Sequence, residues 1–437
     1  MRKKKILYIC DLNLENGGAQ RITIETLPCL SKAFDIFLYV ENKPSADTLK
    51  LLSNLEVHII VDFKLAKDNL KNLLIREEIE LNIIQYENPR WIILGYEIWK
   101  DIGVNYTVLF YELPFINTPT KKVFANWYIQ VFLKIFSSFF KNLNQVSKIS
   151  DLNNKKNQYN KLQSKTSYLK RNYFITKKID DLKKTLIKVR ETRRGLANSI
   201  KIIAMGSASK YYIDKYFGFK NLIEVKNSAS SDIQIVEGLL NLDLKDLKYD
   251  ICFMAARLES GKGVLDVLEV VYRVKQLLGD NIKTVILGKF VDRVTEQQFN
   301  TKLKKLKLEP NVILLGFVSE SVKVTTICSS KIFLYPSKKD IFSISLANAL
   351  YCGIPSVTYD LPFVQQFNSI PMYKTRYRDI RGMTKNVVEL LKMCKFEVLK
   401  FQELRRTIHS TFNENFSWNK TCVEQTEAID SILNVRT

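Results

Sequence analysis

Short apolar segments alternate with stretches of helical periodicity along both halves of this 437-residue chain. Alternating strands and helices build parallel sheets with helices on both faces, because parallel strands need long crossover connections. The segments that we predict as strands are Lys5–Cys10, Asp35–Val40, Val57–Val61, Leu81–Tyr86, Tyr106–Tyr111, Ile200–Gly206 and Leu222–Lys226 in the first half, and Tyr249–Ala255, Lys283–Leu287, Val312–Leu315, Ile332–Tyr335 and Ser356–Tyr359 in the second. The predicted fold class is α/β, with two doubly wound, Rossmann-like sheets.

The length of the chain suits two domains of about 200 residues each. We place the first domain at residues 1–235, including a Lys-, Asn- and Gln-rich insertion at about 141–200, and the second at 236–412. Ligands of such sheets bind beyond the carboxyl ends of the strands, often in the cleft between domains. Motifs at those strand ends are therefore the candidate functional residues.

The segment Asp340–Pro355 follows the predicted strand Ile332–Tyr335 and has the pattern of a short helix ended by Gly-x-Pro. Asp340 lies at the start of that helix, and Asn348 follows about two turns later on nearly the same face. The free N–H groups of a helix start suit a phosphate, and two polar side chains nearby can bind hydroxyl groups. This combination is typical of a nucleotide-sugar site.

Arg257, Lys262 and Gly263 follow the predicted strand Tyr249–Ala255. Two cations beside a diphosphate stabilise the negative charge that develops on this group as it leaves, and so act mainly in the transition state. An ordinary surface turn shows the same short pattern. The Asp340 segment, which lies 83 residues later (340 minus 257), favours a ligand site instead.

Two glycines, Gly17 and Gly18, follow the first predicted strand and open a helix. Glycines at this point let the backbone approach a phosphate or an acceptor closely, although any turn between a strand and a helix can use them. Their position directly after the first strand favours the interpretation as a ligand-binding loop.

These three segments resemble the signature of GT-B glycosyltransferases of the GT4 type, the retaining glycosyl transferases of group 1. The family pattern is Pro-Ser-x-x-Glu-x-Phe-Gly, four variable residues, and Glu-Ala-x-x-x-Gly-x-Pro. It is matched in register at Pro336, Ser337, Phe342, Ala349, Gly353 and Pro355. Asp340 and Asn348 replace the two glutamates, and Ser343 replaces the glycine after phenylalanine. The segment with Arg257, Lys262 and Gly263 is similar to the family's Gly-Arg-Leu-x-x-x-Lys-Gly loop. The segment with Gly17 and Gly18 is similar to its Gly-Gly-Ala-Glu-Arg loop.

The resemblance implies a GT-B fold in which a last helix, at 413–437, crosses back onto the N-terminal domain. It also implies transfer of a sugar from a nucleoside diphosphate sugar to a hydroxyl group, with retention and with neither metal nor cofactor. The acceptor that it suggests is a lipid-linked glycan, or a precursor of a surface polysaccharide or of a glycoprotein glycan.

The resemblance also implies roles for individual residues. Arg257 and Lys262 would bind the donor diphosphate, Asp340 the hydroxyl groups of the donor sugar, and Asn348 the ribose. Glu112 stands near the position of the family's His-Asp pair after the fifth strand. The remaining donor-binding residues that the resemblance implies are Gly17, Gly18, Gly288, Gly316, Phe317, Val318, Phe342, Ser343 and Ile344.

Structural interpretations remain open for several of these residues. Asp340 suits the first turn of a helix, Asn348 could be a solvated residue in mid-helix, and Glu112 could be structural. The alternative function is a GT-B-shaped protein without catalysis that serves as a scaffold or partner in a glycan-assembly complex. The features that favour it are Asn348, Ser343, Ser228 in place of a family glycine, and the absence of the histidine before Glu112.

The formal charge of +22 is concentrated in one region. Residues 141–200 carry sixteen Lys or Arg and four acidic residues, a net +12 (16 minus 4), and an aromatic-rich segment, 124–140, precedes them. Phe124–Lys201 is thus a candidate for docking on an anionic membrane surface. A core helix followed by a solvated basic arm explains the pattern equally well. We expect no nucleic-acid binding, because no recognised binding module accompanies the charge.

Seven cysteines occur without a Cys-x-x-Cys pair, and several lie in apolar segments. This pattern predicts reduced core residues of a cytosolic protein. Two histidines, His58 and His409, argue against a histidine-rich metal site. We expect no signal peptide and no membrane-spanning segment, and therefore a cytoplasmic protein, with the inner face of the membrane as a candidate peripheral location.

Overall fold

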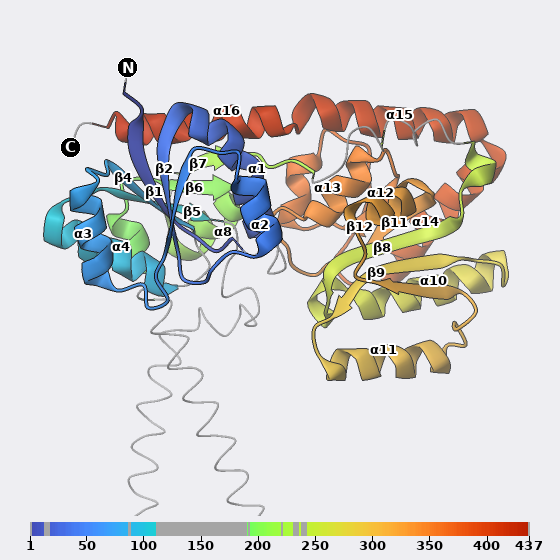
Figure 1. The fold of residues 1–437 in the computed structure, drawn as a ribbon. Coiled ribbons are helices and arrows are strands. Elements are labelled where there is room, and N and C mark those ends of the chain that lie inside the picture. The colour runs from blue at the N-terminus through green and yellow to red at the C-terminus, as the bar shows by residue number, and fades with distance from the viewer. Residues whose placement is uncertain are drawn as a thin grey trace, which may run out of the picture. The chain divides into compact units, whose positions relative to one another are not determined.

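The computed structural model describes residues 2–12, 18–85, 89–110, 190, 193–219, 222–229, 236 and 243–435. Its strands form two sheets in which all neighbouring strands are parallel (Figure 1). Both sheets belong to one compact unit, Met1–Leu113 with Leu196–Thr437, whereas Pro114–Gly195 forms a separate unit. The α/β class and the two doubly wound sheets are confirmed.

The first sheet has the strand order β3-β2-β1-β4-β5-β6-β7. Its strands are β1 (Lys4–Ile9), β2 (Phe34–Val40), β3 (Val57–Val61), β4 (Leu81–Gln85), β5 (Tyr106–Phe110), β6 (Ile202–Met205) and β7 (Leu222–Val225). The described helices that connect them are α1 (Gly18–Ala33), α2 (Ala46–Leu52), α3 (Lys67–Arg76), α4 (Pro89–Ile102) and α8 (Ser207–Phe217).

The second sheet has the order β10-β9-β8-β11-β12-β13. Its strands are β8 (Tyr249–Leu258), β9 (Thr284–Phe290), β10 (Val312–Gly316), β11 (Ser330–Tyr335), β12 (Ser356–Tyr359) and β13 (Tyr373–Thr375). The helices are α10 (Val264–Leu278), α11 (Arg293–Lys305), α12 (Glu320–Cys328), α13 (Ile344–Tyr351), α14 (Ile380–Phe396), α15 (Val398–Asn415) and α16 (Trp418–Leu433), with short 3₁₀ turns at η2 (Leu244–Asp246), η3 (Ser260–Lys262) and η4 (Pro362–Phe367).

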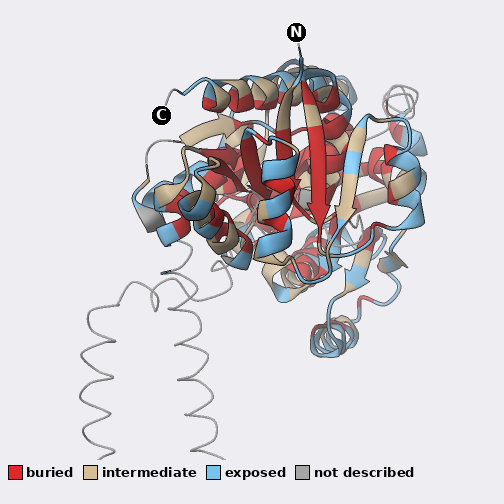
Figure 2. Cartoon of the chain, turned by 60° about the vertical axis from the view of Figure 1, so that its left-hand side comes forward, coloured by how far each residue is buried: buried red, intermediate tan, exposed pale blue. Residues whose placement is uncertain are grey.

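Central strands of both sheets are buried along most of their length (Figure 2). Every residue of β4, β5, β6 and β12 is buried. Parallel strands with helices on both faces have no solvated side, so their sequences are apolar throughout rather than alternating. This explains why the strands could be found in the sequence.

All twelve predicted strands are present, with shifts of a few residues at their ends. Strand β8 continues to Leu258, so Arg257 lies in the strand rather than in the loop after it. Arg257 and Leu258 pair with Lys289 and Phe290 after a shift of register in β8. The sequence analysis missed β13, which has only three residues.

Helix α16 packs on the first sheet, as the resemblance implied. Ala428, Ile429 and Ile432 belong to the core of that sheet. At the amino end of the helix, the Trp418 indole donates a hydrogen bond to the carbonyl of Ala229 at 2.7 Å. The C-terminal helix therefore contributes to the first core, although the boundaries proposed for the domains stay predictions.

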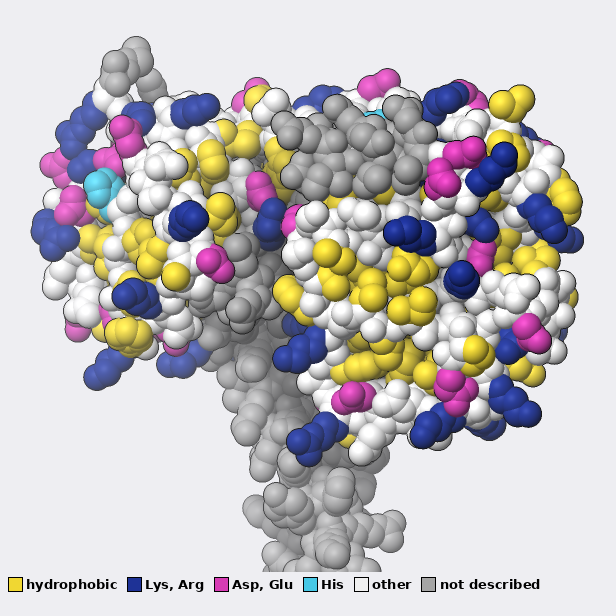
Figure 3. Space-filling model, turned by 45° about the vertical axis from the view of Figure 1, so that its right-hand side comes forward, with side chains coloured by type: hydrophobic (Ala, Val, Ile, Leu, Met, Phe, Trp, Pro, Cys, Tyr) yellow, Lys and Arg dark blue, Asp and Glu magenta, His cyan; other side chains and the backbone are white. Residues whose placement is uncertain are grey.

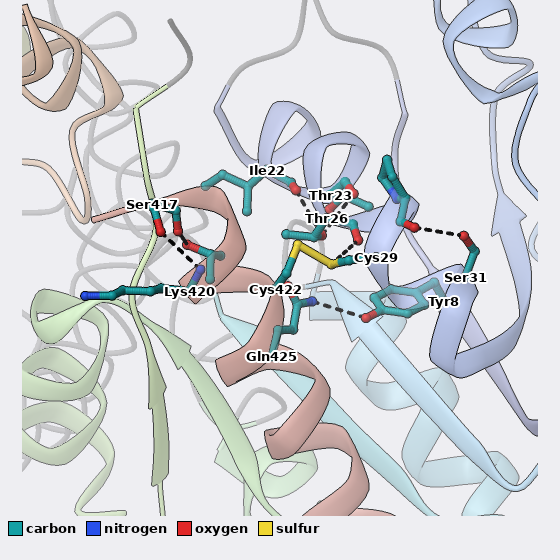
Figure 4. Close-up of a disulfide and its surroundings, with 12 residues drawn as sticks. Tyr8, Ile22, Thr23, Thr26, Cys29, Ser31, Ser417, Lys420, Cys422 and Gln425 are labelled. Carbon is teal, nitrogen blue, oxygen red and sulfur yellow. Dashed lines mark hydrogen bonds between the residues drawn. A yellow bond between two sulfur atoms is a disulfide. The ribbon is translucent and has the colours of Figure 1, made fainter. Parts of the chain in front are cut away.

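A disulfide joins Cys29 of α1 to Cys422 of α16 (Figure 4). The expectation that all seven cysteines are reduced was wrong for these two, because α16 places Cys422 beside a helix 393 residues earlier in the chain. The other five cysteines are buried and form no disulfide within the described residues. The argument for the cytosol from cysteine content therefore does not hold for this pair.

Reduction of the disulfide should lower the free energy of unfolding by about 2–4 kcal/mol, because the cross-link restricts the unfolded chain. We expect dithiothreitol to lower the thermal midpoint of the wild-type protein in differential scanning calorimetry. The control is the double variant Cys29→Ser, Cys422→Ser, whose midpoint should not respond to dithiothreitol. An equal response of both proteins would contradict this prediction.

The basic insertion and most of Phe124–Lys201 lie outside the described residues, so both interpretations of that segment stay predictions. The other 377 residues (437 minus 60) carry the remaining +10 (22 minus 12). On the face drawn in Figure 3, Lys and Arg side chains are interspersed with Asp and Glu. None of the described helices is long and apolar enough to cross a membrane.

Candidate functional site

Two loops of the second sheet lie at the point where its topology changes direction. The chain runs from β8 outward to β9 and β10 on one side, then returns to β11 and continues outward through β12 and β13. Strands β8 and β11 are parallel neighbours, so the segments that follow them start at the same edge of the sheet. Ligands of doubly wound sheets bind at such a switch point.

These two loops touch each other through their backbones. Gly263 has φ +81°, and a Cβ at this position would lie 2.0 Å from the carbonyl oxygen of Pro336. The amide of Lys338 donates a hydrogen bond to the carbonyl of Gly261 at 2.9 Å. Any side chain at residue 263 would force the loops apart, so the glycine is required by the close approach.

A partly buried ion pair also connects the two loops. The Lys262 ammonium lies 2.9 Å from Oδ2 of Asp340. The side chain of Lys262 is 19% exposed and that of Asp340 is 14% exposed. The Tyr335 hydroxyl donates to the same carboxylate oxygen at 2.6 Å. The backbone N–H of Ile341 donates to Oδ1 at 3.0 Å. The sequence analysis assigned Lys262 and Asp340 to different parts of a donor, and the structure brings them together.

Burial would raise the pKa of Asp340, but the Lys262 ammonium and hydrogen bonds to the carboxylate outweigh it and hold the pKa below its ordinary 3.8. Burial would lower the pKa of Lys262, and mainly Asp340 raises it above its ordinary 10.5. The contribution of Asp340 to stability is therefore present above pH 3.8 and is lost as the pH falls through its lowered pKa. That of Lys262 is present below pH 10.5 and is lost as the pH rises through its raised pKa.

Two further ion pairs fasten the same loops. Lys338 lies 3.1 Å from Asp266, at the start of α10, and Lys339 lies 3.8 Å from Glu259. Asp266 also accepts a hydrogen bond from the Tyr359 hydroxyl at 3.0 Å. The arrangement of the two loops therefore rests on three lysine–carboxylate pairs.

Arg257 is exposed near the end of β8, and its side chain makes no hydrogen bond or ion pair with the residues that the structure describes. Gly288 lies in the neighbouring strand β9 with φ +129°, where a Cβ would meet the Ala255 carbonyl oxygen at 1.8 Å. This close approach gives Gly288 a structural reason to be glycine. Gly316, with φ +71°, ends the edge strand β10; Phe317 beyond it is 73% exposed and Val318 packs on the second core.

Helix α13 starts immediately after the Asp340 loop. Ser343 caps it in the left-handed region, at φ +56°, and its hydroxyl accepts a hydrogen bond from the N–H of Leu346 at 3.3 Å. The N–H groups of Ile344 and Ser345 begin the helix and have no intrahelical acceptor. The Phe342 ring is buried and packs near Phe367, with ring centres 5.6 Å apart.

Asn348 lies on α13 with 1% exposure. The interpretation of Asn348 as a solvated mid-helix residue is therefore wrong. Gly18 is the first residue of α1, whereas Gly17 and Glu112 lie outside the described residues, so their assignments stay predictions.

The sequence analysis missed three participants: Tyr335, Asp266 and the pair formed by Lys339 and Glu259. The partner of Tyr335 lies five residues later, whereas the partners of Asp266, Lys339 and Glu259 are distant in the chain and come near only through the strand order. One signal was available for Tyr335, because a tyrosine hydroxyl at the end of a buried strand needs a polar partner. Within the described residues, no group of three or more His, Cys, Asp or Glu side chains could hold a metal ion.

Comparison with protein families identifies the region that contains both loops. Residues 243–369 match the family described as "Glycosyl transferases group 1". These residues are therefore similar to a group 1 glycosyltransferase domain. The domain includes Arg257, Lys262, Asp340 and Asn348. A sequence comparison with curated proteins gives no significant match.

Solved structures resemble the chain over its whole length. A glycosyltransferase from Rickettsia africae has a TM-score of 0.67 and 13% identity, with 100% of both chains covered. HepE from Anabaena, solved in complex with UDP and glucose, has a TM-score of 0.65 and 13% identity over 98% of this chain and 100% of its own. Sucrose-phosphate synthase from Thermosynechococcus elongatus has a TM-score of 0.66 and 10% identity, over 99% of this chain and 100% of its own. The chain therefore has the GT-B fold.

Removing one member of the Lys262–Asp340 pair should cost about 2–4 kcal/mol of the free energy of unfolding, because the partner keeps a poorly solvated charge. We expect Lys262→Met and Asp340→Asn to lose this stability each, and the double variant to lose less than their sum. Urea unfolding at pH 7 measures all three. At a pH below the lowered pKa of Asp340, the wild type and Asp340→Asn should converge.

The control for this prediction is Lys400→Met, which removes an exposed pair with Glu397. Exposed pairs contribute about 0–1 kcal/mol. Equal losses at the exposed and the buried pair, or full additivity of the two buried variants, would contradict the prediction.

The left-handed backbone of Ser343 should make alanine much worse than glycine at this position. At any helix cap, glycine is preferred to alanine, and the left-handed region costs a residue with a Cβ about 1–2 kcal/mol more. The control is Ser417, which caps α16 at φ −128°. We expect the stability difference between the Gly and Ala variants, measured by urea unfolding, to be about 1 kcal/mol larger at residue 343 than at residue 417. Equal differences between the Gly and Ala variants at the two positions would refute this prediction.

Proposed function

We propose that this protein transfers a sugar from a nucleoside diphosphate sugar to a hydroxyl group of a glycan acceptor, with retention and without a metal. The observation that carries this proposal is the Lys262–Asp340 pair at the switch point of the second sheet, within residues that match group 1 glycosyltransferases. The complex of the structurally similar HepE with UDP and glucose supports a nucleotide-sugar donor.

In the proposed reaction, the bond between the anomeric carbon and the diphosphate oxygen breaks, and its electrons remain on the diphosphate. The acceptor oxygen forms the new bond on the same face of the sugar, and its proton passes to the departing phosphate oxygen. Arg257 and Lys262 stabilise the negative charge that grows on the diphosphate during this step. Their fixed positive charge serves the purpose that a metal ion has in other enzymes.

Helix α13 offers a second interaction with the donor. Its first N–H groups, at Ile344 and Ser345, are free to bind a phosphate oxygen and lie at the positive end of the helix dipole. Asn348 follows on the same helix, where its amide group would face the ribose. Gly316, Phe317 and Val318 would frame the nucleobase, and Gly17, Gly18 and Glu112 would lie on the acceptor side.

We propose that the acceptor is a lipid-linked or surface glycan precursor at the inner face of the cytoplasmic membrane. The support is the aromatic and basic composition of Phe124–Lys201, with a net charge of +12 in residues 141–200 (16 minus 4). Binding of the protein to anionic vesicles at low salt, lost when the basic residues of this segment are neutralised, would support this location.

The test of the donor site is a binding panel of UDP-, GDP- and ADP-sugars, measured by isothermal titration calorimetry. We expect one donor class to bind, and Arg257→Ala to weaken it about tenfold or more, because a hydrogen bond to a charged group contributes about 1.5–3 kcal/mol. Arg406→Ala is the matched control, since Arg406 is exposed on α15 and its ion pair within the described residues is with Glu403, 3.9 Å away. No binding to any donor would overturn the proposal.

The alternative function is a scaffold that has kept the fold without catalysis, which Asn348 favours because it lacks the charge of the family's glutamate. The variant Asn348→Glu separates the two functions. Measurable transfer or donor hydrolysis by the wild type, whatever the variant does, supports an enzyme. Donor binding without turnover in both proteins favours the scaffold.

A further inference from the structure

Tyr335 holds a position that no motif assigns to it. It is the last residue of β11, directly before the Asp340 loop, and is 1% exposed. Its hydroxyl donates to Oδ2 of Asp340 at 2.6 Å. Burial and the charge of Asp340 raise the pKa of Tyr335, so the hydroxyl keeps its proton and remains a donor at neutral pH.

The acceptor positions of Asp340 are nearly filled. A carboxylate offers about four lone-pair positions, two on each oxygen. Lys262 and Tyr335 occupy those of Oδ2, and the Ile341 N–H occupies one on Oδ1. A single position remains, which is too few to bind a pair of neighbouring sugar hydroxyl groups.

The same three contacts determine where the Lys262 ammonium lies. Tyr335 is fixed by the sheet and Ile341 by the loop backbone, so together they hold the carboxylate in one orientation. Asp340 then holds the ammonium at 2.9 Å. One of the three ammonium donors is used in this contact, and two are left for a phosphate.

We propose that Tyr335 is a positioning residue that acts through Asp340, and that Asp340 serves to fix the Lys262 ammonium against the donor diphosphate rather than to bind the sugar. This inference rests on the proposed function. It predicts that losing either contact weakens binding of the diphosphate part itself. If Asp340 binds sugar hydroxyl groups instead, its loss weakens only donors that carry a sugar.

The structure supplies a matched control for the loss of a buried tyrosine hydroxyl. Tyr39, in β2 of the first sheet, donates to Oδ2 of Asp62, and neither residue belongs to the two loops of the site. Tyr39 also donates its hydroxyl hydrogen to a carboxylate, and it is as buried as Tyr335. A purely structural effect should therefore appear in both tyrosine variants.

The experiment compares a nucleoside diphosphate with its sugar conjugate: UDP with UDP-glucose, GDP with GDP-mannose, and ADP with ADP-glucose. Calorimetry measures the dissociation constants of whichever pair binds the wild-type full-length protein. We expect Tyr335→Phe and Asp340→Asn each to weaken both members of the pair about tenfold and by equal factors. Tyr335→Phe in the Asp340→Asn background should change binding less than twofold, since the tyrosine acts through the carboxylate. Tyr39→Phe should leave both constants within twofold.

Each other outcome is decisive. Loss of affinity for the sugar conjugate alone, with the diphosphate unchanged, overturns the inference and leaves the proposed function intact. Effects of Tyr335→Phe and Asp340→Asn that multiply in the double variant also overturn it. If Asp340→Asn does not fold, Tyr335→Phe decides by the same comparison of the two ligands. If the wild type binds no member of any pair, the proposed function fails and the inference fails with it.

Discussion

The ion pair between Lys262 and Asp340 joins two segments that are 78 residues apart in the chain, and the arrangement of the site depends on it. The pair can form only because Gly263 lets the backbone of one loop reach Pro336 of the other. That approach depends in turn on β8 and β11 being parallel neighbours, which makes both loops start at one edge of the sheet. The strand order thus allows the contact at Gly263, and this contact allows the ion pair to form.

Most of the fold was predictable because its strands are buried on both faces. The strands Val57–Val61 and Ser356–Tyr359 were predicted with their observed bounds, and the ends of the others differ by a few residues. Strand β13 was missed because Tyr373–Thr375 is too short to show any periodicity. The Cys29–Cys422 bond was missed for a different reason. It depends on where α16 docks, and nothing in the local sequence around either cysteine encodes that contact.

The place of the candidate site residues in the fold was predictable, but their contacts were not. The motifs pointed to Arg257, Lys262 and Asp340, and all three lie in the two strand–loop segments at the switch point. Sequence patterns describe each residue by itself, so they could not show that Lys262 and Asp340 are partners. The burial of Asn348 was likewise invisible, because helical spacing does not say which neighbour covers a face.

The balance of charge at the two loops explains why Arg257 differs from its neighbours. Four cations and three carboxylates gather there, a net +1 (four minus three): Arg257, Lys262, Lys338 and Lys339 against Glu259, Asp266 and Asp340. Each lysine is paired with one carboxylate.

Within the described part of the chain, Arg257 is the cation of this group without a carboxylate partner. A diphosphate would therefore find its strongest uncompensated charge at Arg257, while Lys262 offers donors whose position the carboxylate has already set. The replacement of glutamate by the shorter aspartate fits this division, since a short acid close to the backbone can hold a lysine without extending toward the ligand.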